Sequence, residues 1–176
     1  MKVLYVPKID FSLRRRSIMV RMADYKIARN DQTLTTQALG SCVGVVLYNP
    51  YLRVGGLAHC MLPEPRGKVE AVGKYVSTAI PSMVKDLTFM GCTINSLKAA
   101  VIGGAKILRF SNPEYNSVIF NIGSRNARTA RKVLSELGIP IEVEDVGGTR
   151  GRSLLFDLKT GEILVSYTGR TWLEAR

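Results

Sequence analysis

Hydrophobic and polar residues along this chain follow two periods, and each period predicts its own kind of element. Apolar residues recur at three- and four-residue steps in residues 74–90 and 127–137, which predicts two helices. Pro81 lies inside the first and is expected to kink or restart it. Residues 141–146 alternate as a strand, and two apolar runs within residues 154–167 predict a hairpin. Because strands and helices mix without regular βαβ alternation, we expect a single α+β domain.

A second hairpin is predicted nearer the N-terminus, where two runs rich in Val and Leu are separated by an Asn-Pro pair. The first run ends near Tyr48 and the second begins near Arg53. If these two residues pair, the antiparallel register sets Cys42 opposite His59. Directly opposed side chains share one face of a sheet, so the only histidine of the chain is expected beside a cysteine.

A neighbouring cysteine and histidine suggest nucleophilic chemistry, because histidine is the usual base that generates a thiolate. Such a histidine needs a third group to orient it, and the hydroxyl of Thr36 is the candidate. Gly40 would let the backbone turn tightly and approach a substrate. Gly44 would leave space for a substrate, with close backbone packing as the alternative. For Cys42 and His59 the alternative is that both are ordinary core residues.

The same residues resemble the chemoreceptor glutamine deamidases of the CheD family. Short motifs occur in the order and spacing of that family and cover residues 33–167: Leu39–Val43, Ala58–Pro63, Gly73–Tyr75, Gly103–Ala105, Asn121–Asn126 and Asp145–Gly148.

The resemblance implies hydrolysis of glutamine side-chain amides on methyl-accepting chemotaxis receptors, giving glutamate and ammonia. Cys42 would be the nucleophile, His59 the proton carrier and Thr36 the group that holds the imidazole ring. No cofactor is implied. The expected fold has mixed β-sheets packed together with helices on an outer face, similar to the bacterial toxin glutamine deamidases. A regulatory alternative is a binding module that stimulates a CheC-type phosphatase.

Other residues are expected to contact the substrate. Backbone N–H groups near Gly40, Ser41 and Cys42 are candidates for part of an oxyanion hole. Arg125 and Arg152 are candidates for binding acidic receptor residues, with paired structural arginines as the equal alternative. Asn126 is expected to cap the helix that follows it.

Charge concentrates at the front of the chain. Residues 1–29 hold eight Lys or Arg against two Asp, a net charge of +6 within a total of +11. We expect residues 1–16 to be a flexible arm and residues 17–27 a strand leading to the site, followed by a deamidase domain at 30–168 and a tail at 169–176. The basic front fits an acidic partner or a membrane surface, with a solvated and partly disordered extension as the equal alternative. Nucleic acid is disfavoured, because no aromatic residues interleave with the charges.

Composition excludes several further classes. No apolar run approaches the length of a membrane-spanning helix, and no signal peptide is recognised, so a cytoplasmic location without membrane insertion is expected. Three cysteines do not suggest a disulfide framework. One histidine without a Cys-x-x-Cys pair argues against a zinc site.

Overall fold

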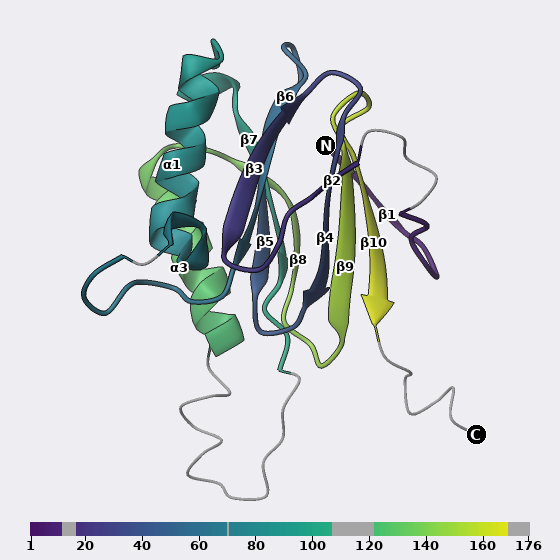
Figure 1. Ribbon diagram of the computed structural model, residues 1–176, viewed down its shortest axis with the longest axis vertical. Helices are drawn as coiled ribbons and strands as arrows, with labels where there is room; N and C mark the ends of the chain where they lie inside the picture. The colour runs from purple at the N-terminus through teal and green to yellow at the C-terminus, as the bar shows by residue number, and fades with distance from the viewer. Residues whose placement is uncertain (12–16, 70, 107–121, 169–176) are drawn as a thin grey trace, which may run out of the picture.

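The computed structural model describes residues 1–11, 17–69, 71–106 and 122–168, and its strands form two packed sheets (Figure 1). One sheet has the order β1-β10-β9-β4-β2 and the other the order β3-β6-β5-β7-β8. The first comprises β1 (Lys2–Tyr5), β10 (Glu162–Thr168), β9 (Gly151–Asp157), β4 (Thr33–Leu39) and β2 (Ser17–Met19). The second comprises β3 (Asp24–Arg29), β6 (Val54–Cys60), β5 (Val43–Asn49), β7 (Lys98–Gly103) and β8 (Ile141–Val146).

Both sheets are mixed, because β1 pairs parallel to β10, β2 to β4 and β7 to β8, whereas the other neighbours are antiparallel. Helices α1 (Val76–Phe89) and α3 (Ile122–Glu136) cover the outer face of the second sheet, on the left of Figure 1. Short 3₁₀ turns, η1 (Val72–Lys74) and η2 (Ile94–Ser96), flank α1. The predicted α+β class, with helices on one outer face, is confirmed.

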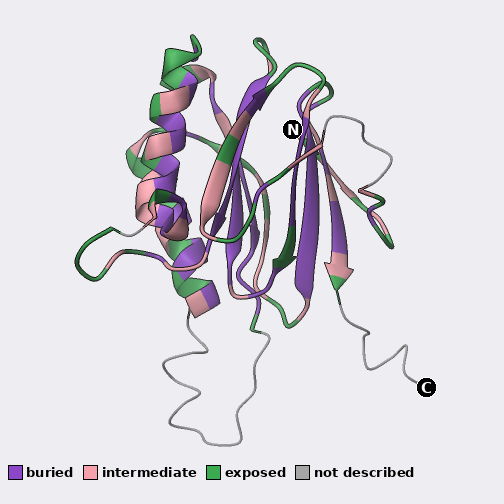
Figure 2. Ribbon diagram, in the orientation of Figure 1, coloured by how far each residue is buried: buried purple, intermediate pink, exposed green. Residues whose placement is uncertain are grey.

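This layering gives the molecule two apolar cores, and β5 and β6, which lie between them, are buried along their length (Figure 2). Val43, Val45 and Leu47 of β5 face the helices, whereas Cys42 and Val46 face the other sheet. Period-2 alternation therefore assigns Cys42 to the core between the sheets, as the sequence indicated. Pro81 does not restart α1, which runs through it as one helix.

The predicted β5–β6 hairpin is confirmed, but its predicted register is wrong. Tyr48 pairs with Gly55 rather than Arg53, and His59 pairs with Gly44 rather than Cys42. The turn is longer than expected, which shifts the pairing by two residues. Because the shift is even, His59 stays on the face that Cys42 occupies.

The N-terminal prediction is wrong in part. Lys2–Tyr5 is not a flexible arm but β1, which adds to the first sheet beside β10. The single strand expected at residues 17–27 is two strands in different sheets, β2 and β3. Residues 12–16, which include three of the basic residues, and the predicted tail at 169–176 lie outside the described residues. Within the described ranges, no helix has the length and apolar character needed to cross a membrane.

Candidate active site

The candidate site lies where the two sheets meet, at the end where β4 stops and β5 begins. The Thr36 hydroxyl on β4 of one sheet lies 2.7 Å from Nδ1 of His59 on β6 of the other. Both residues are buried, with exposures of 0% and 2%. The predicted contact between Thr36 and His59 is therefore present, and it bridges the two layers of the sandwich.

The surroundings of Thr36 determine which histidine nitrogen carries the proton. Its hydroxyl also lies 2.9 Å from the carbonyl oxygen of Val20, which follows β2. A carbonyl can only accept, so the single hydroxyl proton is donated to Val20 and the Thr36 oxygen must accept from Nδ1–H. His59 is thus held as the Nδ1–H tautomer, which leaves the lone pair on Nε2.

That Nε2 atom is buried and has no hydrogen-bond partner among the described residues. Cys42 precedes β5 by one residue and shares a sheet face with Gly44, the residue that pairs with His59. The nucleophile candidate and the free ring nitrogen therefore lie on the same face at the same end of the hairpin. Cys60 points to the opposite face, into the core beneath the helices.

Burial makes both groups neutral at rest. It lowers the pKa of His59 from 6.5 to about 4, because the charged imidazolium loses its hydration. Burial likewise raises the pKa of the Cys42 thiol, and the backbone N–H of Cys42 itself opposes that rise. At neutral pH the site therefore holds a thiol and an unprotonated imidazole, and His59 is available as a base.

The loop that carries Cys42 is held through its carbonyl groups. The Gly40 carbonyl accepts from Ala105 N–H at 2.8 Å, and the Cys42 carbonyl accepts from Gly104 N–H at 2.8 Å. Between them, the Ser41 carbonyl accepts from Nδ2 of Asn126 at 2.9 Å. Three successive peptide groups are therefore fixed in orientation by the end of β7 and by α3.

The glycines at the end of β7 make this contact close. A Cβ at Gly103 would lie 2.5 Å from the Cys42 carbonyl oxygen, and Gly103 has φ +116°. A Cβ at Gly123 in α3 would lie 2.4 Å from the Gly104 carbonyl oxygen. These glycines therefore let α3, β7 and the Cys42 loop approach one another, which accounts for two of the sequence motifs.

The backbone bends before Cys42, and one predicted substrate contact has another role. Residues 40–42 form the bend that follows β4, and Ala38, which has φ +58°, interrupts the β4–β9 register. The space at Gly44 is occupied, because a Cβ there would lie 3.0 Å from a methyl group of Leu39. Close packing, the alternative named above, therefore explains this glycine.

The remaining predicted residues differ in how far they are exposed to solvent. Arg125 is exposed on the first turn of α3, and Ser41 is half-buried beside Cys42. Asn126 does not cap α3 but lies inside it, fully buried, with its amide directed to the Ser41 loop. The sequence gives no local signal for this contact, because the two residues are 85 positions apart.

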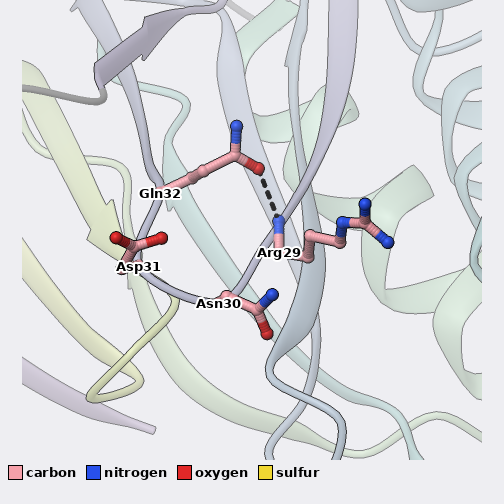
Figure 3. Close-up of a pocket in the computed structure, with 4 residues that line it drawn as sticks. All are labelled: Arg29, Asn30, Asp31 and Gln32. Atoms are coloured by element: carbon pink, nitrogen blue, oxygen red, sulfur yellow. Dashed lines mark hydrogen bonds between the residues drawn. The ribbon is translucent and has the colours of Figure 1, made fainter.

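A hollow elsewhere on the surface is unrelated to this site. Arg29, Asn30, Asp31 and Gln32 line it at the β3–β4 turn, where the Arg29 N–H donates to Gln32 Oε1 at 3.0 Å (Figure 3). Arg29 pairs with Val54, at the opposite end of β6 from His59. Across the part of the chain that the structure describes, no group of three or more His, Cys, Asp or Glu could hold a metal ion.

A buried cysteine and a histidine with one unpartnered ring nitrogen share a sheet face, and a hydroxyl holds the other ring nitrogen. Enzymes with a cysteine nucleophile use these residue types. Residues 61–167 match the family model described as CheD chemotactic sensory transduction, and the chain belongs to the CheD family.

Curated relatives agree with this assignment. The chain is 37% identical over 156 residues to the "Probable chemoreceptor glutamine deamidase CheD" of Clostridium botulinum strain Hall, covering 88% of this chain and 94% of that protein. It is 39% identical over 154 residues to the protein of the same name from Desulforamulus reducens, covering 86% and 91%. The solved structure of Bacillus licheniformis hypothetical protein YfiH is similar with a TM-score of 0.43 and 16% identity, covering 69% of this chain and 49% of that one, too slight a likeness to bear on function.

Proposed function

We propose that this chain is a chemoreceptor glutamine deamidase that hydrolyses glutamine side-chain amides through a thioester on Cys42. The names of the curated relatives support the reaction. The single observation that carries the proposal is the pair of hydrogen bonds on the Thr36 hydroxyl, at 2.9 Å to Val20 and 2.7 Å to His59. Together they hold the imidazole with its basic nitrogen unoccupied.

The first half-reaction consumes the amide. Cys42 Sγ attacks the amide carbon of the substrate while His59 Nε2 takes the thiol proton, so a carbon–sulfur bond forms and the carbonyl oxygen becomes negative. When that intermediate collapses, His59 returns the proton to the nitrogen. The carbon–nitrogen bond then breaks and ammonia leaves, because an amide nitrogen is a poor leaving group unless protonated.

The second half-reaction restores the thiol. His59 takes a proton from a water molecule that attacks the thioester carbon, and the carbon–sulfur bond then breaks. The proton returns to sulfur, and the substrate side chain leaves as glutamate. Throughout both steps the Nδ1–H of His59 keeps its bond to Thr36. A neutral hydroxyl orients the imidazolium but stabilises its charge less than a carboxylate would.

The proposal is tested by incubating the protein with a cytoplasmic fragment of a chemotaxis receptor. Ammonia is measured, and peptide mass spectrometry locates each glutamine converted to glutamate. Cys42→Ala is the inactive variant, and Cys60→Ala is the matched control, because Cys60 is buried on the opposite sheet face. Conversion by the parent and by Cys60→Ala, but not by Cys42→Ala, supports the proposal. Conversion by Cys42→Ala at the parental rate refutes it.

The receptor and a CheC-type phosphatase are the proposed partners, and the location proposed with them is the cytoplasm. Substrate glutamines would enter at the end of the hairpin where Arg125 is exposed. Mixing the chain with a CheC-type phosphatase and measuring phosphate release tests the second partnership. Stimulation that survives Cys42→Ala would show a regulatory role that does not depend on the chemistry.

A further inference from the structure

Asn126 joins the two chain segments that leave the catalytic end of the hairpin. Its Nδ2 donates to the Ser41 carbonyl at 2.9 Å and to the Met61 carbonyl at 2.9 Å. The side chain is 0% exposed. Its Oδ1 is also buried and has no hydrogen-bond partner within the described ranges. Both hydrogens on Nδ2 therefore take part in hydrogen bonds, whereas the amide oxygen Oδ1 accepts none from the described residues.

The bond to Ser41 has a consequence for Cys42. The Ser41 carbonyl and the Cys42 N–H belong to one peptide group, which is planar and trans, so the two point in opposite directions. A donor that fixes the carbonyl therefore fixes the N–H as well. The Cys42 N–H belongs to the same residue as the thiol that would attack the substrate, so the chain itself keeps it close to the reacting atoms.

We propose that Asn126 is a positioning residue that holds the Cys42 backbone N–H in place to donate a hydrogen bond to the oxyanion. This inference rests on the proposed function, because it assumes attack by Cys42 on a carbonyl carbon. A backbone N–H beside the nucleophile stabilises the negative oxygen only if its direction is set before the reaction. The second bond, to Met61, ties the same amide to the segment that follows β6.

The arrangement fits positioning better than simple packing. The β5–β6 ladder ends at the pair Val43–Cys60, so no ladder bond fixes the peptide between Ser41 and Cys42. An apolar side chain at position 126 would fill the space but leave the Ser41 and Met61 carbonyls without this donor. Asn126 instead provides two donors, at a point where the two strands have separated.

Two reactions of Cys42 separate this role from a general effect on the thiol or the fold. Acylation by p-nitrophenyl acetate passes through an oxyanion, whereas alkylation by iodoacetamide displaces iodide and forms none. For Asn126→Leu we expect the acylation rate to fall on the order of a hundredfold, as for loss of one oxyanion donor. The alkylation rate, followed at Cys42 by peptide mass spectrometry, should stay within about threefold of the parent, because that reaction needs no oxyanion donor.

Two further variants keep the test decisive. Leu134→Val, in the buried face of α3 away from the Cys42 loop, is the control and should change neither rate. Asn126→Asp keeps the shape of the side chain but replaces the amide NH₂ group with a carboxyl oxygen. It takes the place of Asn126→Leu in the test if that variant does not fold. It should show the same selective loss of acylation. Parallel loss of both reactions, or loss of neither, overturns the inference.

Failure of the proposed function has a different signature. If the parent releases no ammonia from the receptor fragment yet is acylated, and Asn126→Leu is selectively impaired in acylation, the deamidase proposal fails while the role of Asn126 stands. If the parent deamidates the receptor and Asn126→Leu does so equally fast, the deamidase proposal stands and the role of Asn126 fails.

Discussion

Protonation of His59 should destabilise the folded protein, and the size of the effect follows from its burial. The pKa of His59 is lowered from 6.5 to about 4 in the folded state. Each pKa unit corresponds to about 1.36 kcal/mol, so the folded state prefers the neutral ring by roughly 3.4 kcal/mol. Between pH 6.5 and pH 4 the unfolded chain binds this proton more tightly than the folded chain does.

The sign of the pH dependence follows from that difference in proton binding. The contribution is fully present above pH 6.5 and is lost as pH falls through the folded pKa near 4. Between pH 7 and pH 5 the expected loss is about 2 kcal/mol of unfolding free energy. Carboxylates add losses of their own at lower pH, so the effect of His59 must be taken as a difference between parent and variant.

His59→Gln is the variant that isolates the effect, because it removes the only histidine in the chain. Unfolding free energies are measured by urea denaturation at pH 7, 6 and 5. The parent should lose about 2 kcal/mol more than His59→Gln over this range. The imidazole proton resonances of the parent should titrate with a pKa near 4. Equal losses in the two proteins, or a histidine that titrates near 6.5, would refute the reasoning.

Three further predictions concern activity. Cys42→Ala should abolish ammonia release while Cys60→Ala retains it, measured with the receptor fragment. Thr36→Ala should lower kcat on the order of ten- to a thousandfold, or about 1.4–4 kcal/mol of barrier, and Thr36→Ser should recover much of that loss; a serine variant as slow as the alanine variant would remove the hydroxyl from the mechanism. Arg125→Glu should raise KM for an acidic receptor fragment, with an effect that shrinks at high salt, and leave kcat unchanged; an unchanged KM at low salt would make Arg125 a bystander.

The sequence predicted the hairpin and its buried face because these depend on local patterns. Alternation along β5 set the face of Cys42, and an error of two residues in the register did not alter which face His59 occupies. The Thr36–His59 contact was predicted from the need for a third group, and the structure contains it. The alternation of side chains along the strands and the chemical needs of a histidine base were therefore sufficient to predict that Cys42 and His59 share a sheet face.

Features that depend on packing between distant segments were not predictable. Asn126 was interpreted as a helix cap because it stands near the start of an amphipathic segment, yet its partners are 85 and 65 residues away. For Gly44 both substrate space and close packing stayed open, because the contact with Leu39 depends on the bulge at Ala38, which the sequence does not reveal. Such contacts depend on how the sheets and α3 pack together. The periodic pattern of apolar residues within one segment does not predict that packing.

The packing of the two sheets also determines the protonation of the site. Val20 and Thr36 belong to the segments of the first sheet, and His59 belongs to the second, so the tautomer exists only when the layers are in contact. β2, which leads to Val20, lies within the segment interpreted as a lead-in to the domain. Because the Val20 carbonyl accepts the hydrogen bond from the Thr36 hydroxyl, this segment instead helps to fix which nitrogen of His59 is basic.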